Sequence, residues 1–106
     1  MNNIDNAVDV LISSVRESAV YSEYTEQLSK VKQFPELKKQ IDEFRARNFE
    51  LQNSAGLDVE KLELFEKEYE TFREDPLVAD FLGAELALCR VIQEINNRIV
   101  SAMNFD

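Results

Sequence analysis

Glycine and proline are scarce in this sequence, and that scarcity limits the possible folds more than any other feature. The 106 residues contain only 2 Gly and 2 Pro. Strand-rich folds of this size need many tight turns, and Gly and Pro are the residues that favour such turns. Hydrophobic residues make up 44% of the chain, which is enough for a packed core. The sequence therefore predicts one all-α domain over residues 1–106.

Apolar residues recur at spacings of three and four, which is typical of amphipathic helices. The first stripe runs from Ile4 to Val15. A break near 18–21 separates it from a second stripe over 21–31, and a further stripe follows over 62–72. These patterns predict successive helices, each with one apolar face.

Helix starts are marked by proline and by capping residues. Proline is tolerated in the first turn of a helix, so new helices are predicted to begin at Pro35 and Pro76. Asp58 can cap the helix that follows a loop predicted at 53–56. The last helix is predicted to run over 76–104.

The apolar stripe of this last helix predicts self-association. The helix would have about 29 residues and a length of roughly 43 Å, whereas a compact chain of this size has a radius of gyration near about 13 Å. A second copy is expected to cover the stripe. The predicted fold is an elongated antiparallel helical hairpin that self-associates into a dimeric helical bundle. The candidate oligomer-interface residues are Phe81, Leu88, Val91, Ile95 and Ile99.

The chain lacks the residues on which most catalytic and metal sites depend. It has no His and a single Cys, which removes the commonest general base, the usual zinc ligands and any internal disulfide. We therefore predict no enzymatic activity, no cofactor and no metal. Cys89 lies in an apolar context, so we expect a small core hydrophobe in a reducing cytoplasm.

The net charge of -9 disfavours nucleic acid and anionic membranes as partners. The most apolar stretch, 76–92, is interrupted by charges and is no membrane span. Much of the acidic surplus lies on residues 54–76, which sum to -5. A solvated helix face, including Glu60, Glu63, Glu66 and Glu70, is the simpler interpretation. A docking surface for a basic partner is the alternative.

Glu85 interrupts the apolar run LGAELAL. An unpaired carboxylate is costly in such a place, so we predict a structural ion pair with Arg45, Arg47 or Arg90. The alternative is a contact with a partner protein or a role in setting the register of the helices.

The run DPLVADF at residues 75–81, followed by Ala84-Glu85-Leu86, resembles the YlbF/YmcA family of small bacterial helical proteins. The segments SAVYSEY, PELKKQIDEF and QNSAG agree in order along the rest of the chain. The resemblance implies a self-associating all-helical fold and a non-enzymatic role in competence, sporulation and biofilm formation. Some members belong to a complex with iron–sulfur clusters that is linked to RNA processing through an endoribonuclease. Better-studied members carry cysteines in a C-terminal extension, whereas this chain has only Cys89 and resembles the short members.

Two functions are therefore expected. The first is a cytoplasmic regulatory protein that acts through helix–helix contacts with itself, another family member or a regulatory protein. The second is a small helical chaperone or scaffold that holds clients between its helices.

Overall fold

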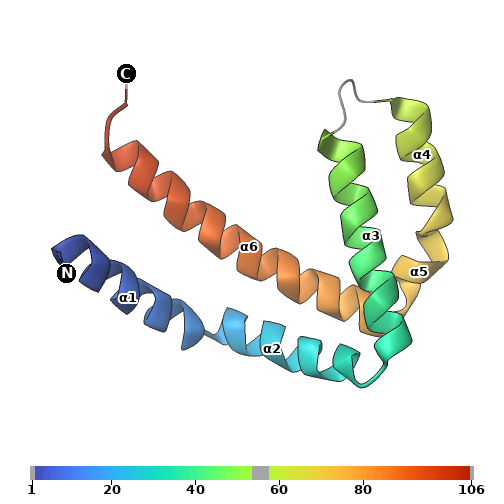
Figure 1. The fold of residues 1–106 in the computed structure, drawn as a ribbon, viewed down its shortest axis with the longest axis horizontal. Helices are drawn as coiled ribbons and strands as arrows, with labels where there is room; N and C mark the ends of the chain where they lie inside the picture. Colours follow the sequence, from blue (N-terminus) through green and yellow to red (C-terminus); the bar gives the residue numbers. More distant parts are fainter. Residues whose placement is uncertain (1, 54–57, 106) are drawn as a thin grey trace.

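The computed structural model describes residues 2–53 and 58–105, and the regular elements in that part of the chain are all α-helices. They are α1 (Asn3–Arg16), α2 (Ala19–Lys32), α3 (Pro35–Asn53), α4 (Val59–Glu68), α5 (Glu70–Glu74) and α6 (Pro76–Ala102) (Figure 1). The prediction of an all-α chain with a long C-terminal helix is confirmed, since α6 has 27 residues. Self-association stays a prediction.

The helix starts predicted at Pro35 and Pro76 are confirmed, and side-chain hydrogen bonds cap several helices. The carboxylate of Asp75 accepts a hydrogen bond from the backbone N–H of Leu77 at 2.9 Å, and Pro76 follows it at the first position of α6. Proline has no N–H to leave unpaired there. Three other helices have side-chain caps of the same kind, from Asn2, Ser18 and Asp58. The predicted loop at 53–56 lies outside the described residues, apart from Asn53, which ends α3.

The core lies where α2, α3 and α6 meet. Four apolar side chains are fully buried there: Val31 of α2, Ile41 of α3, and Val78 and Phe81 of α6. Burying a side chain of this size stabilises a fold by about 1.5–3 kcal/mol. Half-buried hydrophobic residues surround these four: Tyr24, Leu28, Leu37, Phe72, Leu77 and Leu82.

The helices α3, α4 and α5 form a side lobe that projects away from the α2–α6 pair (Figure 1). Its interior is aromatic. The ring of Phe44 stacks on Phe65 with centroids 5.4 Å apart and meets Tyr69 edge-on at 5.0 Å. Phe72 lies 5.9 Å from Phe44 and joins this cluster to the core. Stacked and edge-on pairs are the favoured geometries of aromatic rings.

The helical stripe over 62–72 is interrupted at Tyr69, which separates α4 from α5. The backbone of Tyr69 has φ -100° and ψ 7°, outside the helical range. No Gly or Pro lies between residues 59 and 74, so the sequence gives no sign of this break. The rings of Tyr69 and Phe72 both pack on Phe44 at this point.

The molecule is extended. Its radius of gyration is 17.4 Å, against about 13 Å for a compact chain of this length. We call α1 and residues 88–102 of α6 the arms. The arms run apart toward the N- and C-termini, which lie at the same end of the molecule, opposite the side lobe (Figure 1).

Replacing Phe81 should test the core directly. The variant Phe81→Ala is expected to lower the free energy of unfolding by about 3–5 kcal/mol, because it removes a fully buried ring. Urea denaturation followed by circular dichroism measures this change. The control is Leu86→Ala, at a side chain 50% exposed on the same helix, which should change stability by less than about 0.5 kcal/mol. Equal effects of the two variants would contradict the assignment of the core.

Candidate interaction surface

Helix α1 is amphipathic, yet none of its side chains is buried. Its apolar residues Ile4, Val8, Leu11 and Ile12 are between 38% and 71% exposed. The apolar stripe of a surface helix normally packs on a core. In this chain the stripe of α1 is left largely uncovered.

The candidate interface residues of the last helix fall into two groups. Leu88, Val91 and Ile95 are half-buried and Ile99 is 52% exposed, so these four lie along the α6 arm. Phe81 does not belong with them, because it is fully buried in the core and cannot reach a second copy. The periodicity identified one apolar face, but the first turns of that face are covered by α2 and α3 within the chain itself.

An apolar groove of about 290 Å³ lies between the arms. It is lined by Leu11, Ile12, Val15 and Arg16 of α1, by Tyr21 of α2, and by Leu88, Ile92 and Ile95 of α6. We define the arm surface as this apolar lining together with its continuation along both helices: Ile4, Val8, Leu11, Ile12, Val15, Leu88, Val91, Ile92, Ile95 and Ile99.

Glu85 lies on α6 one turn after the core residue Phe81, before the arm that begins at residue 88. Of the three arginines considered, Arg45 is the one that pairs with it: Arg45 Nη1 donates a hydrogen bond to Oε2 of Glu85. The Glu85 side chain is 21% exposed. Arg47 pairs with Glu68 instead, and Arg90 makes no ion pair within the described ranges. The Arg45–Glu85 pair joins α3 to α6 across 40 residues of sequence.

The ion pair extends into a short network along α3. Arg45 also donates to Asp42 at 2.6 Å, and Lys38 donates to both carboxylate oxygens of Asp42 at 2.7 Å. The hydrogen bond from Lys38, followed by that from Arg45, lowers the pKa of Asp42. Arg45 lies 5.8 Å above the ring of Phe81, within cation–π distance. The network therefore fixes α3 against the core.

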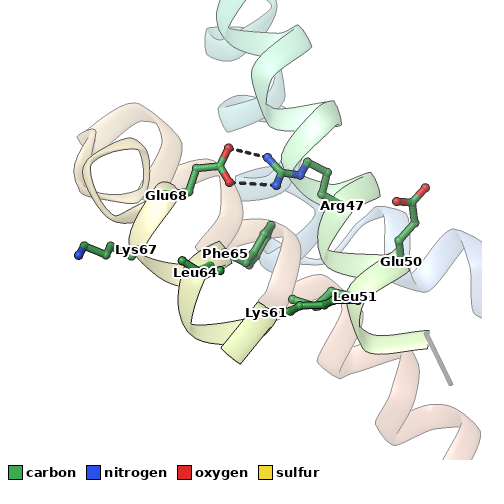
Figure 2. A pocket seen from close by; sticks show the side chains of 8 residues that line it. All are labelled: Arg47, Glu50, Leu51, Lys61, Leu64, Phe65, Lys67 and Glu68. Carbon is green, nitrogen blue, oxygen red and sulfur yellow. Dashed lines mark hydrogen bonds and ion pairs between the residues drawn. The ribbon is translucent and has the colours of Figure 1, made fainter. Parts of the chain in front are cut away.

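A second hollow, of about 860 Å³, lies between α3 and α4 (Figure 2). Arg47 donates two hydrogen bonds to the carboxylate of Glu68, at 2.7 and 2.9 Å, and one to the hydroxyl of Tyr69 at 2.9 Å. The bond to Glu68 raises the pKa of Arg47 and lowers that of Glu68. These two charged groups satisfy each other, and the exposed pair joins α3 to α4 beside the aromatic cluster. The remaining lining residues are Glu50, Leu51, Lys61, Leu64, Phe65 and Lys67.

The predicted acidic face is solvated. Glu60, Glu63, Glu66 and Glu70 are all exposed, and none forms an ion pair within the part of the chain that the structure describes. Whether this face docks a basic partner stays a prediction. Cys89, by contrast, is exposed, so the expectation of a core residue was wrong. It lies on the side of α6 adjacent to the apolar stripe, about 100° from Leu88.

The described residues offer apolar contact area and few reactive groups. Across residues 2–53 and 58–105, no cluster of three or more His, Cys, Asp or Glu side chains is placed to hold a metal ion.

In the same ranges, no helix has both the length and the apolarity needed to cross a bilayer.

Comparison with known proteins identifies the family. The model of the family described as "Control of competence regulator ComK, YlbF/YmcA" matches residues 4–104. The chain therefore belongs to the YlbF/YmcA family, as its sequence motifs had indicated. It is similar to a UPF0342 protein of Staphylococcus epidermidis (strain ATCC 12228 / FDA PCI 1200), with 28% identity over 106 residues, 96% of this chain and 93% of the relative. UPF0342 proteins of Staphylococcus aureus strains JH9 and Newman are 29% identical over the same shares of both chains. No solved structure matches the chain.

A double-mutant cycle should measure the tie between α3 and α6. The variants Glu85→Gln and Arg45→Gln are each expected to destabilise the fold, with a coupling energy of about 0.5–1.5 kcal/mol. The pair is partly exposed, so the value lies well below that of a fully buried pair. Urea denaturation of the four proteins gives the coupling. Arg90→Gln serves as the control, and coupling of Glu85 to Arg90 instead of Arg45 would contradict the assignment.

Acid should weaken the Asp42 network. Since the pKa of Asp42 in the folded chain lies below its ordinary value of 3.8, the charged carboxylate stabilises the fold above that value. The stabilisation is lost as the pH falls through the lower, folded-state pKa. Asp42→Asn should therefore cost about 0.3–0.5 kcal/mol at neutral pH, and this cost should disappear as the pH falls through the folded-state pKa of Asp42. The measurement is thermal melting across pH. Glu63→Gln, which removes an exposed carboxylate without an ion pair, should show no neutral-pH cost, and a similar cost in both variants would contradict the role of the network.

Proposed function

We propose that this chain is a non-enzymatic cytoplasmic regulatory protein that acts by helix–helix contacts made through its arm surface. In this proposal α1–α2 and α6 serve as the elongated antiparallel hairpin that presents the contact residues. The side lobe, which the Arg45–Glu85 pair joins to α6, supports the arms from the opposite end of the molecule.

One observation carries the proposal: exposed apolar side chains line one face of α1 and of the outer half of α6. Of the fifteen exposed large hydrophobic residues in the described chain, six belong to the arm surface: Ile4, Val8, Leu11, Ile12, Ile92 and Ile99. Contiguous apolar surface of this kind is typical of protein contacts. The lack of His in the sequence supports a role without catalysis.

The family description indicates the biological process in which these contacts would act. Its description refers to control of a competence regulator, and the resemblance extends that role to sporulation and biofilm formation. We therefore propose that the contacts of the arm surface serve regulation of this class, with another family member or a regulatory protein as partner.

A chaperone or scaffold is the second candidate, because the groove between the arms is almost wholly apolar and open at the surface. Such a groove can hold apolar segments of unrelated clients. A chaperone should suppress the aggregation of several unrelated proteins, whereas a specific regulator should leave their aggregation unchanged and retain one or a few partners.

Substitutions on the arm surface should separate contact from folding. Leu11→Asp and Ile99→Asp place a charge on the apolar stripe and are expected to abolish partner capture from an extract of the native cell. Matched controls are the neighbouring residues Val10→Asp and Val100→Asp. These side chains are also exposed but point about 100° away around the helix.

Circular dichroism should show the helical content of wild type in all four variants. If the two stripe variants capture partners as well as the two controls do, the proposed use of the arm surface is wrong. Suppression of aggregation that is lost only in the stripe variants would favour the chaperone.

A further inference from the structure

We propose that the hollow between α3 and α4 is a second docking site, and that its occupant is an acidic amphipathic helix of a partner protein. The hollow lies in the side lobe, at the opposite end of the molecule from the arm surface (Figure 1). The inference therefore goes beyond the proposed function and does not depend on it. It rests on the apolar centre of the hollow, on the charge of its lining and on the spacing of three residues of α4.

The centre of the hollow is apolar and open to solvent. Leu64 of α4 lines it with a side chain that is 67% exposed, and Leu51 and Phe65 line it as well. Phe65 is only 6% exposed, and its ring stacks on that of Phe44 with centroids 5.4 Å apart. This packing holds the apolar wall in place before any ligand arrives, as is usual for binding grooves.

The charge of the lining has the opposite sign to that of the whole chain. Its charged residues are Arg47, Lys61, Lys67, Glu50 and Glu68, three positive and two negative, which sum to +1. The whole chain carries -9. Arg47 and Glu68 neutralise each other through two hydrogen bonds. Lys61 and Lys67 form no ion pair within residues 2–53 and 58–105, so carboxylates of a partner can pair with them.

Helix α4 thus separates its charges. Both of its lysines line the hollow, whereas Glu60, Glu63 and Glu66 do not belong to the lining. An acidic partner is attracted at the lysines and repelled by the glutamates on the rest of the helix. Complementary charges of this kind select the partner and fix its orientation.

The spacing of the lining residues on α4 favours a helix over a small anion. Leu64 lies three residues from each lysine, and Lys61 and Lys67 lie on either side of it (Figure 2). Along the helix axis the two lysines are about 9 Å apart. Carboxylates at positions i and i+7 of a partner helix are about 10.5 Å apart, and apolar side chains at i+3 and i+4 lie between them to meet Leu64. A small amphiphile with one carboxylate reaches only one lysine.

Binding of synthetic peptides tests the proposal. The acidic probe is a helical peptide of about 18 residues, long enough to be helical in water on a background of alanine and glutamine. It has Glu at i and i+7 and Leu at i+3 and i+4, and the basic probe has Lys in place of both Glu. Fluorescence anisotropy should show that the protein binds the acidic probe at least about tenfold more tightly. This preference should shrink as salt is raised toward about 1 M, because the charges are screened.

Removing the two lysines should weaken binding of the acidic probe. The double variant Lys61→Gln/Lys67→Gln is expected to raise the dissociation constant about three- to tenfold, since exposed ion pairs are individually weak. The matched control is Lys32→Gln/Lys39→Gln, which removes the same charge at exposed positions outside the lining. It should leave the constant within about twofold of wild type.

Removing the apolar centre should weaken binding of both probes. Leu64→Gln is expected to raise the dissociation constant at least about fivefold, because it takes away the central apolar contact. Its control is Val59→Gln on the same helix, which is 61% exposed and lies outside the lining. Circular dichroism should show wild-type helical content in every variant, since all the replaced side chains are exposed.

Several results would overturn the proposal. Equal binding of the acidic and basic probes would do so, as would equal losses in the variants and their controls. Leu11→Asp and Ile99→Asp should bind the acidic probe as wild type does, and a loss confined to these two would place the peptide on the arm surface instead. Laurate that binds as tightly as the acidic probe, with the same loss in the lysine variant, would replace the helix by a small anion. An oligomer that dissociates in the lysine variant would put α4 of a second copy in the hollow and exclude a separate partner.

Discussion

The packing of Phe81 against α2 and α3 is the interaction on which the other elements depend. The fully buried core consists of Phe81, Val78, Val31 and Ile41. These residues come from the consecutive helices α2 and α3 and from α6, which is distant from both in sequence. Arg45 lies over the ring of Phe81 and pairs with Glu85 one turn further along α6. We call this packed region, where α2, α3 and α6 meet, the junction. It sets the direction of α6 and of the side lobe. Because the helices are long and straight, it also sets how far apart the arms lie.

The buried core and the exposed apolar surface lie in different parts of the molecule. At the junction, apolar side chains are covered within one chain, and the aromatic cluster around Phe44 extends that packing into the side lobe. In the arms, the same kinds of side chain remain exposed. Helix α1 has no buried residue, so its local free energy of opening is expected to be the lowest among the longer helices. A partner on the arm surface would stabilise α1 more than any other element, since binding to the folded state adds to its stability.

Local signals in the sequence predicted the helices and their starts, whereas relations between distant helices were predicted less well. The capping residues Ser18, Asp58 and Asp75 act on their own backbone neighbours, so their roles are visible in the sequence. The break at Tyr69 coincides with the packing of Tyr69 and Phe72 on Phe44, which is far away in sequence. Periodicity also places Phe81 on the same face as Ile95 and Ile99, because it does not show which turns of a helix other helices cover. In the structure Phe81 is buried and Ile99 is exposed. Cys89 was placed in the core because its neighbours are apolar, but it lies about 100° from Leu88 around the helix, outside the stripe. The apolar stripe of α1 can be recognised in the sequence. The separation of α1 from α6 cannot be predicted from the sequence, because it depends on how α2, α3 and α6 pack together.

The two termini lie at the same end of the molecule, at the tips of the diverging arms (Figure 1). A donor dye at one terminus and an acceptor at the other would therefore report the spread of the arms by resonance energy transfer, within a single chain. Rotation of α1 about the break at Glu17 and Ser18 would change that transfer while leaving the core intact. For the same reason a purification tag at either end lies next to the contact residues and can mask them. A label near Phe34, in the exposed link between α2 and α3, lies at the far end of α2 and reports on the rest of the molecule without touching the arms.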